Sequence, residues 1–381
     1  MGSVTLHLRA RRGRLVARHH LGRTGSSATQ AVSDLVALHS SDPLTPHLAL
    51  WARVPDYQSG QLDAAQSEAG GLWRLHAMRR TLWVAAAGEV GMMYAAAGEA
   101  VAARERARLL GWIEPVRPDA VDWLASLERR VVEAIRAQPG VSTRALSKAL
   151  PELTTRIEVG SGKWKTQTAV GPRVLYQLAM ELTLMRTPPA GSWRSSQYGW
   201  AVAGAVDRVD ADAARATLVR RYLQRFGPVT TEDVKWWTGL TMAQTKRALR
   251  ACETVTVALA GGDAWDLQGT GSDDPTGVAL LPGLDPTPMG YKVRGWFLGD
   301  HEAALFDRNG NVGPTVWVEG RIAGGWAVRA GGSVRVKLLE DVGAEASAAV
   351  TRRAAELEAW LDGTSITPRF RTPLERELTA S

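Results

Sequence analysis

The segment between residues 210 and 267 constrains the fold most, because its turn and cap residues occur in an order that few structures accommodate. A helical pattern runs from residue 210 to the break at Gly227-Pro228. Two short helices are expected next, separated by Gly239, and each begins with a capping box: Thr230-Thr231-Glu232-Asp233 and Thr241-Met242-Ala243-Gln244. Two strand patterns joined by a glycine turn follow, at 255–259 and 264–267. Helix, turn, helix and hairpin in this order predict a winged-helix unit.

A second unit of the same kind is predicted upstream. Its first helix ends at Pro139-Gly140. Its apolar residues lie three to four apart, at Leu124, Leu127, Val131 and Ile135. Ser142 can cap a short helix, after which residues 156–168 resemble an inserted hairpin with glycines at its tip. Another helix is expected to carry Leu175, Leu178, Leu182 and Met185 on one face, before a wing that contains Trp193, Arg194, Tyr198 and Trp200.

The N-terminal portion predicts a third and less regular copy. Helices are expected at 14–20 and 29–39, and Asp42-Pro43 matches an N-cap followed by proline at the start of a helix that runs to about Arg53. Strand patterns at 72–76 and 81–85 flank Met78-Arg79-Arg80, which would form the wing.

After residue 270, glycine and proline separate short strand patterns, and a helix is expected at 344–362. The candidate strands are 278–282, 302–307, 315–319, 321–328 and 333–340. The predicted fold class is therefore α+β and mainly α, with three tandem winged-helix motifs, a small C-terminal antiparallel β-barrel and a terminal helix. The expected units are 1–115, 116–207 with the inserted hairpin, 208–270 and 271–381.

The charge balance favours a polyanionic partner. The chain has 46 Lys and Arg against 39 Asp and Glu, a formal charge of +7. Six arginines and no acid lie in the first 25 residues, and residues 156–200 carry six basic residues against Glu158 and Glu181. Two basic patches are expected, with double-stranded DNA as the partner.

The single cysteine, Cys252, excludes an intramolecular disulfide and a cysteine-based zinc site, as is typical of a reducing compartment. The histidines lack metal-ligand spacing, so neither a metal nor a cofactor is expected. No apolar stretch reaches the length of a membrane span, and the arginine-rich N-terminus lacks the apolar core of a signal peptide. We expect a cytoplasmic monomer; an organellar transit peptide is the alternative interpretation of the N-terminus.

Several segments resemble one family in their order and spacing: Leu35 to Pro43, Leu50-Trp51-Ala52-Arg53, Leu281-Pro282 through Asp285 to Gly290-Tyr291-Lys292, and Asn309-Gly310 through Pro314-Thr315-Val316 to Gly320-Arg321. In these segments the chain resembles the AlkZ/YcaQ-type winged-helix proteins. Studied members of that family are DNA glycosylases that remove bulky or crosslinked N7-alkylated purines. The resemblance implies three winged-helix units around a DNA channel, a C-terminal β-barrel, and a role in base excision repair of alkylation damage.

The catalytic motif of that family is Gln-apolar-Gln or Gln-apolar-Asp, and it falls on His39-Ser40-Ser41, where both outer residues differ. An N7-alkylated purine is already cationic, so a glycosylase must mainly stabilise oxocarbenium character at C1′ and place a water. His39 could act as base or orient that water, Ser41 could hold it, and Asp42 is the only carboxylate nearby. The structural alternatives are that His39 belongs to an apolar helix face and that Asp42 is an ordinary N-cap.

Three groups of residues are candidates for DNA contact. Trp164 stands between two cations on the glycine-tipped hairpin, a pattern that suits stacking beside phosphate neutralisation. The wings and the second helix of the third unit supply the others, and the alternative for each group is an ordinary solvated turn or helix face. The candidates are Arg79, Arg80, Lys163, Trp164, Lys165, Arg194, Tyr198, Lys246, Arg247 and Arg250.

Two hypotheses follow from these observations. The first is a monofunctional DNA glycosylase acting on N7-alkylated purines. The second is a non-catalytic winged-helix DNA-binding protein, either a lesion sensor or a transcription regulator. A buried His39 that faces the core would favour the second hypothesis.

Overall fold

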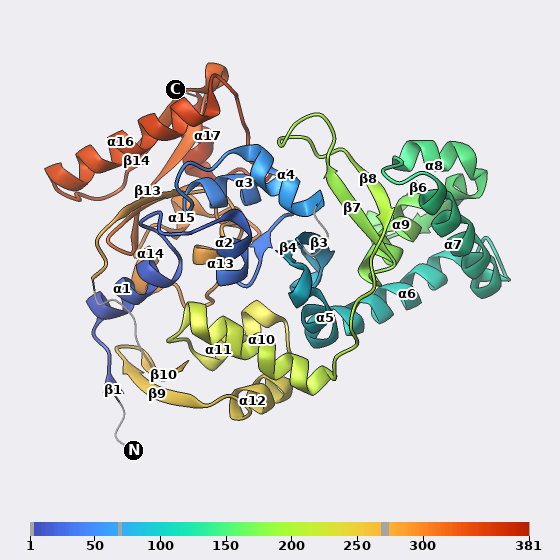
Figure 1. Ribbon diagram of the computed structural model, residues 1–381, viewed down its shortest axis with the longest axis horizontal. Coiled ribbons are helices and arrows are strands. Elements are labelled where there is room, and N and C mark those ends of the chain that lie inside the picture. Colours follow the sequence, from blue (N-terminus) through green and yellow to red (C-terminus); the bar gives the residue numbers. More distant parts are fainter. Residues whose placement is uncertain (1–3, 68–70, 268–273, 381) are drawn as a thin grey trace.

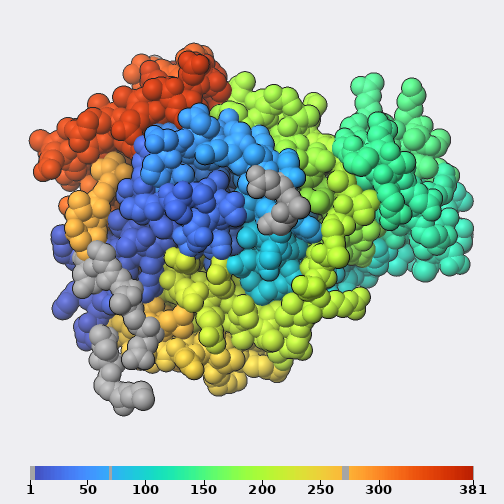
Figure 2. Space-filling model, in the orientation of Figure 1, coloured from blue at the N-terminus to red at the C-terminus, as the bar shows by residue number. Residues whose placement is uncertain are grey.

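The computed structural model describes residues 4–67, 71–267 and 274–380, which form an α+β fold of helices and several small, mostly antiparallel sheets (Figure 1). Two hydrophobic cores account for most of the buried apolar side chains. Helix α6 (Glu99–Ile113) leads from the larger core into the smaller one, which stands out as a lobe on one side of the molecule (Figures 1 and 2). No helix in the described ranges is long and apolar enough to cross a membrane.

The elements predicted between residues 210 and 267 are confirmed. Both capping boxes form, and Gly239 ends the first short helix with a φ of 74°. The elements are α10 (Ala211–Phe226), α11 (Thr231–Thr238), α12 (Met242–Arg250), β9 (Thr254–Leu259) and β10 (Gly262–Leu267). Strand β1 (Val4–Thr5) joins this hairpin by pairing in parallel with β9, so the chain's N-terminal segment shares a sheet with its middle.

The smaller core confirms the inserted hairpin and the apolar faces predicted for this lobe. Its elements are α7 (Ala120–Ala137), α8 (Thr143–Ala149), β5 (Arg156–Val159), β6 (Thr166–Ala169), α9 (Gly171–Met180), β7 (Leu184–Pro189) and β8 (Tyr198–Val202). The helix expected to continue through Met185 ends at Met180 instead. Leu182 has a φ of 57°, which an α-helix cannot contain, and the chain then turns into β7.

The N-terminal segment differs from its prediction in two ways. The first helix begins earlier, at Leu8, and the helix expected at 29–39 ends at Asp34 because Val36 adopts a left-handed conformation with φ 66°. Residues 38–39 instead pair with a strand of the next hairpin, in the sheet order β2-β4-β3. The elements are α1 (Leu8–Arg18), α2 (Ala28–Asp34), β2 (Leu38–His39), α3 (Leu44–Trp51), α4 (Ser59–Ser67), β3 (Leu72–His76), β4 (Leu82–Ala86) and α5 (Val90–Met93).

The C-terminal strands form an open four-stranded sheet in the order β11-β12-β13-β14, where a closed barrel was expected. Helix α16 packs against both edge strands, so side-chain packing takes the place of the strand pairing that would close a barrel. The predicted strand at 302–307 is wrong, since Glu302–Leu305 is a helical turn. The elements are β11 (Val278–Leu281), α13 (Pro286–Met289), α14 (Gly295–Leu298), α15 (Glu302–Leu305), β12 (Thr315–Val318), β13 (Arg321–Val328), β14 (Val334–Leu338), α16 (Ala344–Leu361) and α17 (Pro373–Ala380).

The larger core combines three of the four expected units, because apolar residues from 15–96, 214–252 and 279–378 pack into one cluster. A buried ion pair crosses it. The fully buried guanidinium of Arg53 binds both carboxylate oxygens of Asp285 at 2.7 and 2.8 Å, and it also donates to the carbonyl oxygens of His19 and Ala49 and to the Thr287 hydroxyl. Arg53 therefore joins the end of α3 to the end of α1 and to the start of α13.

We predict that Arg53→Met lowers the free energy of unfolding by about 3–5 kcal/mol, because it leaves the Asp285 carboxylate buried without a counter-charge. Urea denaturation measures the loss, and the double variant Arg53→Met/Asp285→Asn should recover part of it. The control is Arg247→Ala, which removes an exposed ion pair with Asp212 and should cost less than about 1 kcal/mol. Equal losses in both single variants would contradict the prediction.

Candidate active site and nucleic-acid interface

His39 lies at the end of β2, directly opposite Trp83 of β4. Its side chain is 8% exposed, and its ring packs edge-to-face on the Trp83 indole at a centroid distance of 5.2 Å. The Ser41 amide donates a long hydrogen bond of 3.4 Å to His39 Nδ1. Because Nδ1 accepts this bond, the neutral ring carries its proton on Nε2. The backbone thus sets both the orientation and the tautomer of the imidazole.

Burial, together with the positive charge of Arg79, lowers the pKa of His39 from 6.5 to about 4. The ring is therefore neutral at pH 7 and a weak base. Next to it, the Ser40 hydroxyl is buried and has no hydrogen-bond partner among the described residues.

Asp42 binds backbone amides near the start of α3, as expected if it is an N-cap and not a catalytic residue. Its Oδ1 accepts the Leu44 amide at 3.0 Å and its Oδ2 accepts the Arg369 amide at 2.7 Å. Burial raises the pKa of Asp42, and these two amides and the Arg369 charge oppose the rise. Both oxygens of Asp42 are thus engaged by backbone amides.

Four arginines, which we call the arginine rim, surround this site: Arg79, Arg186, Arg294 and Arg369. Arg79 and Arg294 stack on the same Trp236 ring at 4.1 and 5.0 Å from its centroid. Arg369 donates to the Ser41 carbonyl at 3.2 Å, and its charge acts on Arg186. None of the four has a carboxylate within 4.0 Å in the described parts of the chain. The rim is a positive surface beside His39 that we call uncompensated because none of its guanidinium groups has a direct ion pair, although Glu302 and Asp233 act on Arg294 from beyond 4.0 Å.

Of the rim, only Arg79 was a candidate from the sequence. Arg369 lies 328 residues from its partner Ser41, so no local pattern connects the two residues. Its neighbours Arg308, Arg371 and Arg376 line a cavity of about 720 Å³ that opens beside it. The basic stretch after α16 is the one sequence signal that could have indicated this surface.

The two other wing arginines, Arg80 and Arg194, each contact a neighbouring part of the protein. Arg80, which follows Arg79 in the left-handed turn Met78–Arg80, pairs with Glu105 at 3.3 Å. Arg194 donates to the Ser365 carbonyl at 3.0 Å, whereas the Tyr198 ring lies under the Arg186 guanidinium at 4.2 Å. Tyr198 is thus the wing residue that adjoins the arginine rim.

The inserted hairpin, formed by β5 and β6, lies in the smaller lobe (Figure 1). Trp164 is 75% exposed, Lys163 lies 5.5 Å from its ring centroid, and Lys165 pairs with Glu158 at 2.6 Å. Lys246, Arg247 and Arg250 are exposed on α12, where Arg247 pairs with Asp212 at 2.7 Å.

The predicted basic patch at the N-terminus is wrong, because most of its arginines serve the core. Arg11 is 7% exposed and stacks on Trp296, and Arg12 donates to the Trp296 carbonyl. Arg14 and Arg18 both pair with the buried carboxylate of Asp266. Helix α1 and the inserted hairpin also lie at opposite ends of the molecule's long axis (Figure 1), so they do not line one trough.

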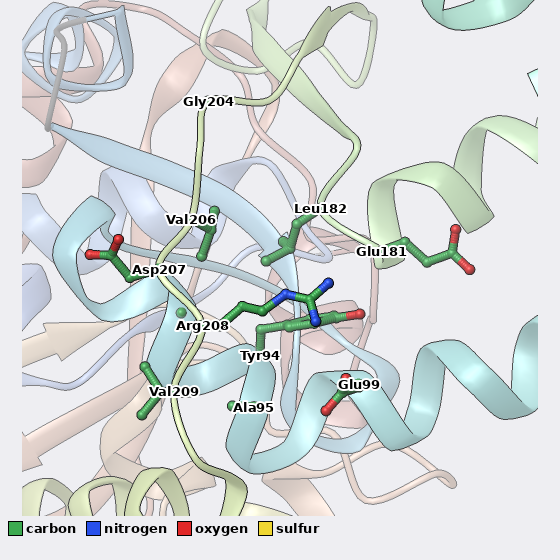
Figure 3. Close-up of a pocket in the computed structure, with 11 residues that line it drawn as sticks. Tyr94, Ala95, Glu99, Glu181, Leu182, Gly204, Val206, Asp207, Arg208 and Val209 are labelled. Carbon is green, nitrogen blue, oxygen red and sulfur yellow. The ribbon is translucent and has the colours of Figure 1, made fainter. Parts of the chain in front are cut away.

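A separate cavity of about 400 Å³ lies beside the segment that leads from β8 to α10. Figure 3 shows the Arg208 guanidinium lying alongside the Tyr94 ring at this cavity, with Glu99 below. It contains no residue of the 39–41 motif, so it is distinct from the site at His39.

Comparison with known proteins agrees with the resemblance seen in the sequence. The family model described as "DNA glycosylase AlkZ-like" matches residues 32–360. The chain belongs to the AlkZ-like DNA glycosylase family. DNA is therefore the partner that the family implies.

The solved structures include a similar one, Streptomyces sahachiroi DNA glycosylase AlkZ. It matches with a TM-score of 0.70 and 20% identity, covering 96% of this chain and 99% of that one, so the two proteins share a fold. No curated protein sequence matches the chain.

We predict that NMR titration of His39 gives a pKa near 4, and that Arg79→Met raises it while leaving it below 6.5, because burial remains. The folded ring takes up its proton at lower pH than the unfolded one, so stability from this group is lost as pH falls from about 6.5 toward 4. The control Arg80→Met should leave the pKa unchanged. A His39 pKa near 6.5 in the wild type would contradict this electrostatic description.

Proposed function

We propose that this protein is a monofunctional DNA glycosylase that removes N7-alkylated purines and acts in base excision repair. The observation that carries the proposal is that a neutral, rigidly held His39 occupies the family's motif position beside the uncompensated arginine rim. The rim supplies positive charge for the phosphates that flank a lesion.

The chemistry that these residues can support restricts the substrate. In the reaction, water attacks C1′, the electron pair of the glycosidic bond passes to N9 of the purine, and the proton of the attacking water is released to solvent. The oxocarbenium character at C1′ is opposed by the nearby Arg79 charge, and Asp42 has both oxygens engaged. A base that already bears positive charge loses it on leaving, so a cationic N7-alkylpurine suits this site better than a neutral base.

His39 acts by position more than by basicity. A group with a pKa near 4 accepts little of the water's proton at pH 7, whereas its Nε2–H can hold a sugar or water oxygen. Ser41 lies beside it and can hold the same water. The described contacts of His39, Ser41 and Asp42 include no lysine amine that could form a Schiff base with the sugar, which favours a monofunctional enzyme.

One observation favours the second candidate function, a non-catalytic DNA-binding protein that senses lesions or regulates transcription. His39 is buried and Asp42 is committed to capping, so the site holds few groups free for chemistry. The arginine rim serves either function.

We also propose that the helix-plus-hairpin sets are winged-helix units, with boundaries near residues 115, 207 and 270, and that a monomer binds double-stranded DNA. Contacts are proposed at Arg79, Arg80, Lys163, Trp164, Lys165, Arg194, Tyr198, Lys246, Arg247 and Arg250.

We predict slow release of N7-methylguanine from N7-methylated duplex DNA, measured as abasic sites, and a loss of at least tenfold in His39→Ala. The variant His39→Gln/Ser41→Asp, which restores both outer residues of the family motif, should excise faster than wild type. If wild type and this double variant both leave the DNA intact while binding it, the protein is the non-catalytic binder.

We predict that Lys163→Ala/Lys165→Ala weakens DNA binding and reduces the slope of log affinity against log salt by about two, since each phosphate contact releases roughly one counterion. Fluorescence anisotropy at several salt concentrations measures the slope. An unchanged slope would remove the inserted hairpin from the interface.

A further inference from the structure

Two arginines, Arg74 on β3 and Arg186 on β7, lie on neighbouring strands between the two hydrophobic cores, close enough for their charges to interact. Strand β3 packs against β7, α4 and α9 at this junction. Burial lowers the pKa of Arg74 to about 10, Asp63 opposes this effect, and the charge of Arg186 adds to it. The same Arg186 charge acts on His76, the next residue on that face of β3. Two positive charges are therefore held close together in a poorly solvated place.

Several polar atoms at this junction are buried and have no hydrogen-bond partner among the described residues. They include Nε and Nη2 of Arg74, Nε of Arg186 and Nδ1 of His76, together with Oδ1 of Asp63. Arg74 is 7% exposed, and neither guanidinium has a carboxylate within 4.0 Å in the described ranges. Asp63 influences Arg74 only from a greater distance. Buried N–H groups without partners are unfavourable, and so are two like charges that only a more distant carboxylate opposes; a bound anion would relieve both.

Arg186 connects this junction to the site at His39 through Arg369. Arg186 is partly exposed, its guanidinium lies 4.2 Å above the Tyr198 ring, and its charge is coupled to that of Arg369. Arg369 in turn donates to the Ser41 carbonyl. An anion held by Arg186 would thus lie on the same surface as the 39–41 motif.

We infer that Arg74 and Arg186 form a phosphate-binding site, and that its occupant is a phosphodiester of the DNA strand that passes His39. The second part rests on the proposed DNA-binding function. The planar guanidinium groups supply paired N–H donors suited to a phosphate oxyanion, with the partly exposed Arg186 as the outer group and the buried Arg74 as the inner one.

The test uses the full chain and thermal unfolding in inorganic phosphate against chloride at equal ionic strength. Phosphate at about ten times its dissociation constant should raise Tm by roughly 2 °C. Arg186→Gln should abolish the rise, whereas Arg352→Gln, an exposed arginine on α16, should retain it. Arg74→Met tests the inner group wherever that variant folds. No rise in the wild type, or an equal rise in Arg186→Gln, would overturn the phosphate site.

A second arm identifies the occupant. Saturating unmodified duplex DNA should eliminate the further rise in Tm caused by phosphate, and Arg186→Gln should lower the salt slope of DNA affinity by about one. If phosphate still raises Tm on the DNA complex and the slope is unchanged, the site takes free phosphate and the phosphodiester assignment is wrong. Neither arm measures base release, so failure of the glycosylase proposal is distinguishable from failure of this one.

Discussion

The buried ion pair between Arg53 and Asp285 is the interaction on which the rest of the structure depends. It is enclosed on all sides, and it ties α3 to the end of α1 and to the segment that follows β11. This connection fixes the N-terminal helices against the C-terminal sheet. The chain after α16 can then reach back and place the Arg369 amide on Asp42 and its guanidinium on the Ser41 carbonyl. A core contact between Arg53 and Asp285, which lie 232 positions apart in the sequence, thereby supports the geometry of the candidate site.

The arginines of α1 and those of the arginine rim differ in whether a carboxylate neutralises their charge. Those of α1 are neutralised or enclosed, because Asp266 lies within reach of two of them and Trp296 covers a third. Those of the arginine rim have no such carboxylate and stack on aromatic rings instead. Cation–π stacking orients a guanidinium while leaving its net charge available, which is the property that a phosphate-binding surface needs.

The chemical character of the site follows from the same arrangement. Burial against Trp83 and the charge of Arg79 keep His39 neutral, and capping occupies Asp42. Such a site positions groups well and stabilises a cation poorly. The chain belongs to the AlkZ-like DNA glycosylase family, and the proposed cationic substrate is the one that asks least of such a site.

Local patterns in the sequence determined the capped helix starts and the hairpins of residues 210–267, because a cap or a glycine turn acts over three or four residues. Both capping boxes and Gly239 formed as predicted, whereas α1, which no side chain caps, begins six residues before its predicted start. Local patterns also pointed to the family and to His39. Only the tertiary structure showed that α2 ends before Val36, so that His39 lies in a strand. It also showed that the C-terminal sheet stays open and packs against α16, and which arginines lack a direct ion pair. The physical reason is distance along the chain. The pairs that decide charge and access, such as Arg369 with Ser41 and Arg18 with Asp266, join residues hundreds of positions apart, so only the packed chain determines which charges meet a partner.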